Sequence, residues 1–518
     1  MGQWMEGFVK QLERVRQENL EAGGPERIET QHKMGKLTVR ERIDRLLDPG
    51  SFRELGSVVR DVHPPTVRGK ITPRSACDGV VIGLGHIAGR EVAVYGTDFT
   101  VMSGAIGDQG AWKIADLITM AGDMRIPLIA MFDSAGERFS IKDGDVGCDG
   151  FAHVLKNHST HSGFIPQIGL VLGPCTGLVA YAASLCDFLI MNKNTSFLWL
   201  GGKKESMDGG TAYRHMVSAG QCDLMAESDE EALEHVKKLL AFVPQNCWEK
   251  PPTEKTDDPL DRMEEGLLDI MPDDSRFTYD IHEIIERIVD NGEFYEFKED
   301  FASHLVTGFA RFGGRPVGIV ANNPDELSGL LEPDSSDKYD RFMSFLDAFN
   351  IPLVTFSDTT AFVPGDAWER KGVLRHGAKL LHTYSRLTTA KITIQLRRSY
   401  GGGNLVMGSK GMGPDFLYGW PTTEFAPTGP ETVLQAVFNK ELTKAREDGN
   451  YDEVHDKLLA ILQEQFSVMT CARFWTPIYT VQEVIDPRET RPVIIRTLQA
   501  LENKHKFLPE NKRAIKPA

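Results

Sequence analysis

The sequence predicts an α/β protein in which one folded unit occurs twice. The chain repeats itself at a nearly fixed distance, and within each repeat short apolar strands alternate with amphipathic helices. Its length of 518 residues also exceeds what one hydrophobic core usually organises. Strands that alternate with helices favour layers of sheet and helix joined by crossover connections.

The repeat is clearest in a hairpin that turns on glycine. The segment IGLGHIAGREVAVYG at 82–96 has a counterpart in TGFARFGGRPVGIVA at 307–321, and Asp133 and Asp358 are likewise 225 positions apart. Each copy is therefore expected to contain a hairpin, an amphipathic helix, an apolar strand, a helix, a second apolar strand, a glycine turn and a further helix. The run GLGHIAG at 83–89 is interpreted as the hairpin turn rather than a dinucleotide-binding loop, because no helix follows it.

A segment rich in proline and charge, EKPPTEKTDDPLDR at 249–262, is expected to link the two copies. We place the boundary near residue 260, which gives an N-terminal domain of residues 1–260 and a C-terminal domain of residues 261–518. A helical extension precedes the first copy. The sequence also lacks the phosphate-binding loop of ATP-binding proteins.

The composition is that of an ordinary globular protein, with 41% hydrophobic and 25% charged residues. The net charge of −16 argues against nucleic acid as a partner, because phosphate contacts need clustered lysine and arginine. The seven cysteines include no C-x-x-C pair, which disfavours a zinc ribbon and a disulfide framework. The charged N-terminal segment lacks the apolar core of a signal peptide. We therefore expect a cytoplasmic protein, or an organellar one if a transit peptide has been removed.

One stretch, at 164–186, carries no charge over 23 residues and is long enough to cross a bilayer. Prolines and glycines interrupt it, and its parts IGLVL and LVAYAASLC are typical of a buried strand, a turn and a buried helix. We therefore expect no membrane span.

Two small-residue turns are the first candidates for chemistry. Each follows a strand and is expected to precede a helix: Ala135-Gly136 in IPLIAMFDSAGERF, and Gly401 to Gly403 in ITIQLRRSYGGGNLVM. N–H groups at such a turn can hold an anion, and two that point at one carbonyl oxygen stabilise an enolate or a tetrahedral oxyanion. The alternative is that both turns need glycine only for packing, and the residues alone leave this open.

Side chains are weaker candidates. Ser134 does not lie in a G-x-S-x-G elbow, which disfavours a hydrolase nucleophile. His158 and His161 could share one face of a helix, but no acidic pattern accompanies them, so we expect no metal site. His376 is expected to be a packing or surface residue rather than a general base. The chemistry is then expected to rest on backbone dipoles and a cofactor brought by another protein.

Five longer segments are specific enough to indicate a family: QHKMGKLTVRERIDRLLDPGSF (31–52), GFIPQIGLVLGPCTG (163–177), FNIPLVTFSDTTAFVPG (349–365), GVLRHGAKLL (372–381) and YGGGNLVMGSKGMGPDFLYGWP (400–421). In these segments the chain resembles the carboxyltransferase (β) subunit of biotin-dependent acyl-CoA carboxylases, the propionyl-CoA and methylcrotonyl-CoA carboxylase group. The resemblance covers nearly the whole chain. It implies two duplicated crotonase-like domains, each a ββα superhelix, with an N-terminal helical extension.

The resemblance implies a subunit that transfers CO2 from carboxybiotin to an acyl-CoA through an enolate stabilised by backbone N–H groups. A partner would carry the biotin, because nothing here resembles a biotin attachment site or an ATP-grasp module. The implied partners are a biotin carboxylase and a biotin carboxyl carrier protein, separate or fused. The implied assembly is a homohexamer built as a trimer of dimers, and no metal is implied for this chain.

The resemblance also implies site residues. Oxyanion donors fall on Gly136 and Glu137 for the acyl-CoA thioester and on Gly402 and Gly403 for carboxybiotin, although the sequence leaves open which pair serves which carbonyl. The remaining implied positions are Ala135, Gly177, Ala361, Asn404 and Leu405 for substrate, and Gly365 and Gly401 for biotin.

The chain departs from the family pattern at several of these points. Glu137 brings a carboxylate beside a supposed anion site, and the segment after Gly202 is shortened. Asn404 and Leu405 stand where the family shapes its acyl pocket, so the acyl group stays open. Two alternatives remain: a decarboxylase or transcarboxylase subunit that runs the same half-reaction in reverse, and a catalytically silent structural subunit.

Overall fold

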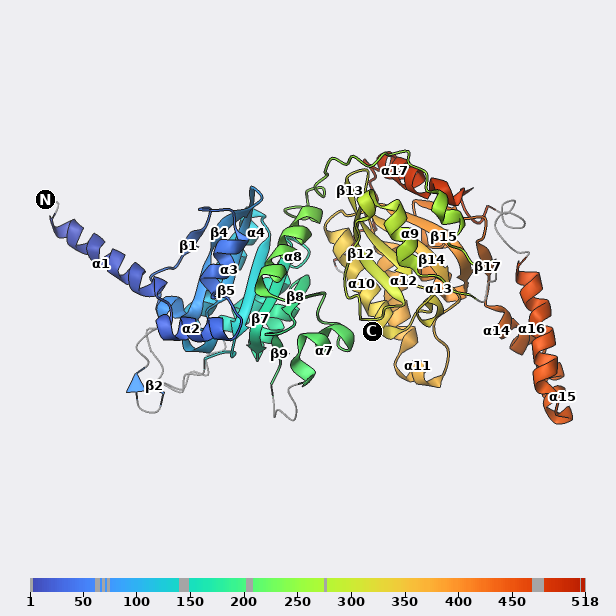
Figure 1. Cartoon of the computed structure of the whole chain (residues 1–518), viewed down its shortest axis with the longest axis horizontal. Helices are drawn as coiled ribbons and strands as arrows, with labels where there is room; N and C mark the ends of the chain where they lie inside the picture. The colour runs from blue at the N-terminus through green and yellow to red at the C-terminus, as the bar shows by residue number, and fades with distance from the viewer. Residues whose placement is uncertain are drawn as a thin grey trace. The chain divides into compact units, whose positions relative to one another are not determined.

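The structure, a computed structural model, describes residues 3–60, 66–67, 70–71, 75–138, 149–201, 208–273, 277–467, 479–512 and 514–517. They form two compact units, Met1–Glu249 and Lys250–Ala518, each with its own sheet and helices (Figure 1). The division falls at the start of the segment expected as a linker. This segment packs on the second unit, where the N–H of Glu254 donates to the carbonyl of Gly314 at 2.9 Å.

The first unit contains an eight-stranded mixed sheet in the order β1-β4-β5-β6-β7-β8-β10, and β9 pairs with β7. β4 and β5 form an antiparallel hairpin, whereas β5, β6, β7, β8 and β10 run parallel. The strands are β1 (Arg53–Leu55), β4 (Val80–Ile87), β5 (Arg90–Thr97), β6 (Leu128–Ser134), β7 (Gln167–Thr176), β8 (Phe188–Asn192), β9 (Phe197–Trp199) and β10 (Leu224–Ala226), with a separate pair β2 (Thr66–Val67) and β3 (Lys70–Ile71).

The helices of this unit cover the sheet and precede it at the N-terminus. They are α1 (Gln3–Leu20), α2 (Pro25–Lys33), α3 (Val39–Leu46), α4 (Asp108–Met124), α5 (Asp149–Thr160), α6 (Leu178–Ser184), α7 (Ala212–Val217) and α8 (Asp229–Phe242). A capping box begins α3, because Thr38 Oγ1 accepts from the N–H of Glu41 while the Glu41 carboxylate accepts from the N–H of Thr38. The apolar face of α4 joins the strands in one buried core.

The second unit repeats this architecture in the order β11-β12-β13-β14-β15-β16-β18, with β17 paired to β15. Its strands are β11 (Tyr295–Glu296), β12 (Leu305–Phe312), β13 (Arg315–Asn322), β14 (Leu353–Thr359), β15 (Lys391–Tyr400), β16 (Phe416–Gly419), β17 (Glu424–Ala426) and β18 (Glu483–Val484). Its helices are α9 (Ile281–Ile288), α10 (Pro333–Ala348), α11 (Asp366–Arg370), α12 (Val373–Arg386), α13 (Gly401–Val406), α14 (Pro430–Val437), α15 (Asn439–Asp448), α16 (Tyr451–Ser467) and α17 (Thr490–Ala500).

The two sheets share even an irregularity of register, which confirms the duplicated α/β fold expected from the sequence. The pairing of β6 with β7, and of β14 with β15, is interrupted by a bulge near the end of the later strand. From the last pair before the bulge to the first pair after it, the later strand advances by four residues and the earlier strand by two. The pairs on either side of this bulge are Phe132–Val171 and Ser134–Cys175 in the first unit, and Ser357–Gln395 and Thr359–Ser399 in the second. The bulge bends β7 and β15 just before each strand ends.

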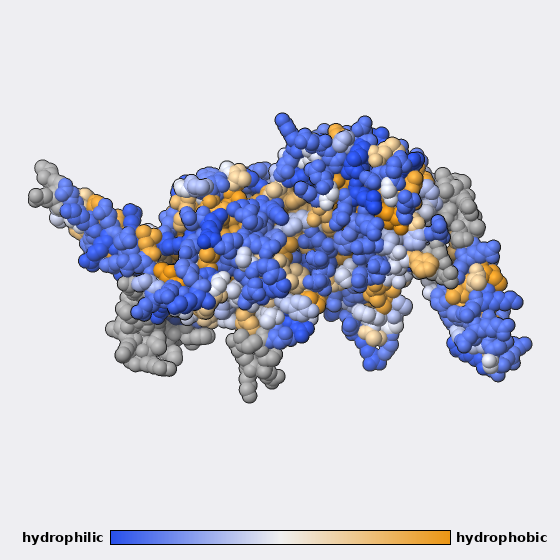
Figure 2. Space-filling model, viewed as in Figure 1, coloured by the Kyte–Doolittle hydropathy of each residue, from blue (hydrophilic) through white to orange (hydrophobic). Residues whose placement is uncertain are grey.

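The uncharged stretch at 164–186 forms β7 and α6, as predicted, and most of its residues are buried in the first unit. Across the described residues, no helix is both long enough and apolar enough to cross a membrane. On the face shown in Figure 2, hydrophilic residues predominate and hydrophobic ones lie scattered among them.

A buried lysine ties α4 in the first unit and α10 in the second to the segment just before the β4–β5 or β12–β13 hairpin. Lys338 Nζ on α10 donates to the carbonyls of Lys298 and Phe301, both at 2.9 Å. Lys113, 225 positions earlier on α4, donates in the same way to Cys77 and Val80. Burial lowers the pKa of Lys338 from its ordinary 10.5 to about 7.

We expect the substitution Lys338→Met to destabilise the protein by an amount that grows as the pH rises from about 7 to 10. The pKa of the wild-type lysine is lower in the folded state than in the unfolded state, so unfolding takes up a proton between these two pKa values. Raising the pH in this window therefore increases the free energy of unfolding of the wild type by up to about 1.4 kcal/mol per pH unit. The variant lacks this gain. Urea midpoints at several pH values measure the gap, and Lys237→Met, a partly exposed lysine on α8, serves as control. The expectation would be contradicted if the difference in urea midpoint between the wild type and Lys338→Met stayed as constant with pH as the difference for Lys237→Met.

Candidate functional site

Each unit ends its central bulged strand in a glycine turn that starts a short helix. In the first unit β7 is followed by Gly177, whose φ is 69°, and then by α6. In the second unit β15 is followed by Gly401, whose φ is 49° and which begins α13. The two turns occupy equivalent places in the repeat, 224 positions apart. They are the strongest candidates for an anion site.

The first N–H groups of a helix have no acceptor within it. Within the described chain, neither Gly177 nor Tyr400, the N-cap residues, caps its helix with a side chain. The N–H groups of Leu178 and Val179, and those of Gly402 and Gly403, therefore lie at the positive end of a helix. Such groups can donate to a carbonyl oxygen that gains negative charge.

The three glycines of the second turn are not equally required by packing. A Cβ on Gly401 would lie 2.7 Å from the carbonyl oxygen of Pro427, and one on Gly403 would lie 2.9 Å from Thr359 Cγ2. A Cβ on Gly402 would meet only the ring of Phe362, at 3.6 Å, which is an ordinary contact. The packing alternative thus explains two glycines and leaves Gly402 without a structural reason.

A short loop lies beside each glycine turn. In the first unit Glu137 forms an isolated bridge with Ile106, and in the second Phe362 forms the equivalent bridge with Leu331. Ala361, predicted as a substrate position, precedes Phe362 and lies against Gly403. The structure therefore brings Ala361 together with Gly402 and Gly403.

No helix begins directly after Ala135-Gly136 in the described residues, and the next helix described, α5, starts at Asp149. Between the end of β6 and Arg138 the described chain contains a single bridge residue, Glu137, and no helix. The N–H of Ala135 donates to Ser103 at 2.9 Å, and the N–H of Gly136 donates to Ser134 Oγ at 3.1 Å. Both amides thus have acceptors inside the protein.

Gly136 nevertheless lies next to the first glycine turn. A Cβ on Gly136 would come within 3.2 Å of the carbonyl oxygen of Thr176, the residue before Gly177. Leu178 and Val179, whose N–H groups begin α6, were not among the residues predicted from sequence. The signal was present, because the register that pairs Gly177 with Gly401 also pairs Leu178 with Gly402.

The remaining predicted positions of the second unit lie in α13 or, for Gly365, in the loop between β14 and α11. Asn404 is in the first turn of α13, and its Oδ1 accepts from Gln395 Nε2 at 3.1 Å. Leu405 is 42% exposed. Gly365 precedes α11 with a φ of 121°, and a Cβ there would meet open space.

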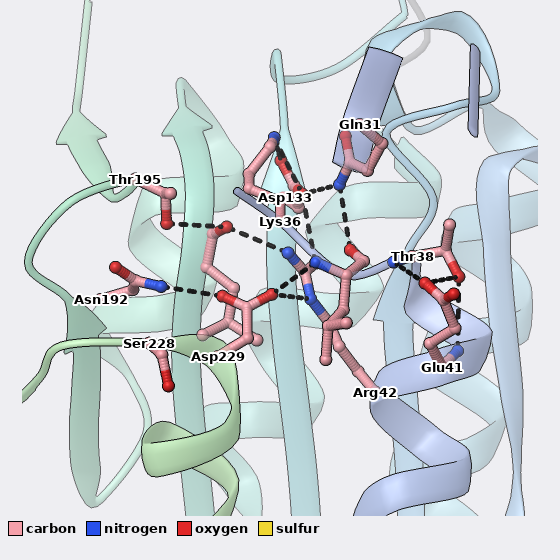
Figure 3. A network of polar contacts seen from close by, with 12 residues as sticks. Gln31, Lys36, Thr38, Glu41, Arg42, Asp133, Asn192, Thr195, Ser228 and Asp229 are labelled. Atoms are coloured by element: carbon pink, nitrogen blue, oxygen red, sulfur yellow. Dashed lines mark hydrogen bonds and ion pairs between the residues drawn. The ribbon is translucent and has the colours of Figure 1, made fainter. Parts of the chain in front are cut away.

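A buried carboxylate stands opposite the bulge in each unit. Asp133, at the end of β6, is fully buried and accepts from Lys36 Nζ at 2.8 Å and from Arg42 Nη1 at 3.1 Å (Figure 3). Arg42 Nε also contacts Asp229 at 2.8 Å, and its Nη2 donates to the carbonyl of Leu172 at 3.1 Å. Residues of the N-terminal extension therefore bind directly to the core of the sheet.

Asp358, the counterpart of Asp133, is neutralised from within its own sheet. Arg397 Nε donates to it at 3.0 Å, Arg398 Nε at 2.7 Å, and the Tyr279 hydroxyl at 3.0 Å. Burial alone would raise the pKa of Asp358, but Arg398 and Arg397 hold it below its ordinary value. Gly173 occupies the place of Arg397 in the first unit, and a Cβ there would lie 2.0 Å from Asp133 Oδ1.

The side chains judged weak from sequence have structural roles. Ser134 Oγ donates to the carbonyl of Gly104 at 2.7 Å. His158 is fully buried between the Tyr95 hydroxyl and Gln167 Oε1, and burial lowers its pKa to about 4. His376 pairs with Asp337 at 2.8 Å. Among the described residues, no group of histidine, cysteine and acidic side chains could hold a metal ion.

Comparison with known proteins gives matches over almost the whole chain. The model of the carboxyl transferase domain matches residues 30–515. The chain is 37% identical to the propionyl-CoA carboxylase, carboxyltransferase subunit, of Haloferax mediterranei, with 99% of each chain covered. It is also 37% identical to the methylmalonyl-CoA decarboxylase subunit alpha of Veillonella parvula, with 93% of each chain covered.

A solved structure matches equally well. It is described as transcarboxylase 12S, hexamer assembly and substrate binding to a multienzyme core, with methylmalonyl-coenzyme A and methylmalonic acid bound. The TM-score is 0.90 at 37% identity, and 99% of each chain is covered. This match confirms the predicted fold class of two crotonase-like units.

The substitution Arg42→Met is expected to destabilise the first unit by about 3–5 kcal/mol, because it removes the cation that bridges two buried carboxylates. Arg45→Met on the same helix removes only a half-exposed pair with Glu230, and should cost no more than about 1 kcal/mol. Urea denaturation of both variants compares the two costs. Equal destabilisation would show that the buried network contributes nothing beyond a surface ion pair.

Proposed function

The chain belongs to the carboxyl transferase family, and we propose that it moves CO2 from carboxybiotin on a partner protein to the acyl group of an acyl-CoA. The observation that carries this proposal is the pair of equivalent glycine turns, one in each unit, whose first N–H groups have no acceptor within their helices. Two sites of this kind match a reaction with two carbonyl oxygens, one on each substrate.

In this reaction negative charge develops on two carbonyl oxygens, one on the biotin and one on the thioester. Carboxybiotin supplies CO2 when its N–CO2 bond breaks. The α-carbon of the acyl-CoA loses a proton and forms the new C–C bond, and the biotin nitrogen that gives up CO2 can take that proton. Backbone N–H groups hold the negative charge that develops on each carbonyl oxygen, so that no side-chain base is required in this chain.

We assign Gly402 and Gly403 to the carbonyl of carboxybiotin, as the family resemblance implies. For the thioester oxygen we replace Gly136 by Leu178 and Val179, because the N–H of Gly136 already donates to Ser134 Oγ. Gly136 and Glu137 then belong to the wall beside this turn. Experiment decides whether the two turns have these roles or the reverse, with the first unit serving carboxybiotin and the second the thioester.

We further propose that the neighbours of the turns contact the substrates. Ala361, Asn404 and Leu405 would line the second turn, and Leu405, being exposed, offers an apolar surface to the acyl group. Ala135 and Gly177 would do the same in the first unit, and Gly365 and Gly401 would lie near biotin. Apolar lining of this kind favours an apolar acyl group over a charged one.

The partners follow from the same proposal. A biotin carboxylase would load the biotin, and a biotin carboxyl carrier protein would bring it to the turns. The transcarboxylase 12S relative is described as a hexamer assembly, and we propose a homohexamer, a trimer of dimers, for this chain as well. The acyl-CoA is a substrate of the reaction and not a cofactor that stays bound to this chain.

A second candidate is the reverse half-reaction, decarboxylation or transcarboxylation of a carboxyacyl-CoA. A relative named methylmalonyl-CoA decarboxylase subunit alpha is as similar as the carboxylase relative, at 37% identity. One site serves both directions, so the partner proteins decide between them. Purification of the native complex and identification of its subunits is the direct test.

Replacing Gly402 by valine is expected to lower carboxyl transfer by at least about 100-fold and leave the oligomer intact, because the branched side chain would cover the N–H groups. The assay mixes the purified protein with carboxybiotin and a panel of acyl-CoAs and follows labelled CO2. Gly411→Val is the control, since a Cβ there meets open space. Unchanged turnover for Gly402→Val would remove this residue from the site. Wild-type protein that transfers nothing to any acyl-CoA would favour a silent structural subunit.

The first-unit donors are tested by a residue that lacks an N–H. Leu178 is the first residue of α6, where proline is tolerated, so Leu178→Pro should delete one donor and keep the helix. We expect kcat to fall by about 10²–10³. Leu178→Ala keeps the N–H and loses similar packing, and should therefore retain most of the activity. Equal effects of the two changes would assign the loss to the side chain.

A further inference from the structure

We propose that Gln395 is the positioning residue of the second glycine turn: it fixes the direction of the N–H groups of Gly402 and Gly403. This inference rests on the proposed function, because it concerns how the amides of that site are held. Gln395 lies in β15 before the bulge and is fully buried. Because its side chain has no exposed surface, it acts through the turn and not by contact with the substrates.

One amide side chain joins three successive parts of the chain. Gln395 Oε1 accepts from the Ser399 hydroxyl at 2.7 Å, and its Nε2 donates to Asn404 Oδ1 at 3.1 Å. Ser399 lies beyond the bulge, and Asn404 lies in the first turn of α13. Gln395 therefore connects the strand before the bulge, the strand after it and the helix.

The contact with Ser399 is possible only because the strand bends. Four residues of a regular strand span about 13 Å, which the side chains of Gln395 and Ser399 cannot bridge. The bulge shortens this distance, and the hydrogen bond then holds the bend. The end of β15 is thus fixed in direction where the turn begins.

The turn needs such support because Gly401 to Gly403 lie between the two contacts. Glycine has the widest range of backbone conformations, so three in succession do not set the direction of their own N–H groups. Asn404 follows them directly, and its bond to Gln395 fixes the far side of the turn. The turn is therefore held at both ends by one buried residue.

The first unit supplies an internal comparison. The residues equivalent to Gln395, Ser399 and Asn404, each 224 positions earlier, are Val171, Cys175 and Ala180. None of these can form the same pair of bonds. That turn contains a single glycine, and the Cβ atoms of Leu178 and Val179 after it restrict their backbones more than that of glycine. The polar contacts thus occur only in the copy with three glycines.

The test compares Gln395→Met with a matched control, Gln167→Met. Gln167 is also fully buried and also makes two side-chain contacts, to His158 Nδ1 and to the His158 carbonyl, but it starts β7 at the end far from Gly177. Both variants are assayed in the full chain with carboxybiotin and propionyl-CoA. Hydrogen exchange of the amides of residues 401–405 is measured in parallel, without substrate.

For Gln395→Met we expect kcat to fall by about 10- to 100-fold with KM for propionyl-CoA changed by less than about threefold, because misplaced donors weaken the transition state more than substrate binding. Exchange at 401–405 should become faster. Gln395→Glu should restore most of the rate, because a carboxyl group buried without a cation stays protonated: its carbonyl oxygen accepts from the Ser399 hydroxyl and its O–H donates to Asn404 Oδ1. Gln167→Met should change neither the rate nor this exchange.

A rate for Gln395→Met within about twofold of the wild type would overturn the proposal, even if exchange were faster. An equal fall in rate for Gln167→Met would also overturn it, because the effect would then be one of general stability. If the wild-type protein transfers no CO2, the proposed function fails instead. Unchanged exchange in Gln395→Met would then also refute the positioning of the turn.

Discussion

Asp133 and Asp358 are the buried charges around which both halves of the molecule are arranged. Each lies at the end of a strand, opposite the bulge that bends its neighbour toward the glycine turn. A carboxylate in such a position is stable only when cations and hydrogen-bond donors surround it, and removing one partner leaves a charge in a medium of low dielectric constant. The bulge, the turn and the helix after it therefore depend on where these cations come from.

The two units meet this requirement in different ways. In the second, Arg397 and Arg398 on the bulged strand bind Asp358 themselves. In the first, the position of Arg397 is Gly173, which has no side chain and leaves room for Asp133 to approach. The cations come instead from Lys36 and Arg42, before and within α3. The N-terminal extension is thus part of the first unit, because it supplies the charges that the duplicated strand lacks.

The sequence was sufficient for the duplicated fold, because glycine hairpins, apolar strands and amphipathic helices recur at one spacing. It was less informative for the first turn, where the family resemblance implied Gly136 and Glu137 as donors but no pattern showed which amides have acceptors inside the protein. The acceptor of the Gly136 amide, Ser134 Oγ, depends on how the loop folds back, which no local pattern reveals. The pairing of Lys36 with Asp133 joins residues far apart in the chain, and was equally invisible before the fold was known.

The glycines of the second turn separate what the fold requires from what it does not. Gly401 and Gly403 are required by packing, since a Cβ on either would meet another part of the chain at less than 3 Å. Gly402 has an ordinary backbone conformation, and its Cβ would have space beside Phe362. Glycine there costs about 0.5–1 kcal/mol relative to alanine in a helix and gives the fold nothing in return. A position that the fold leaves bare at such a cost is explained when another molecule must come close to its N–H, which is the role that we propose for Gly402 in carboxyl transfer.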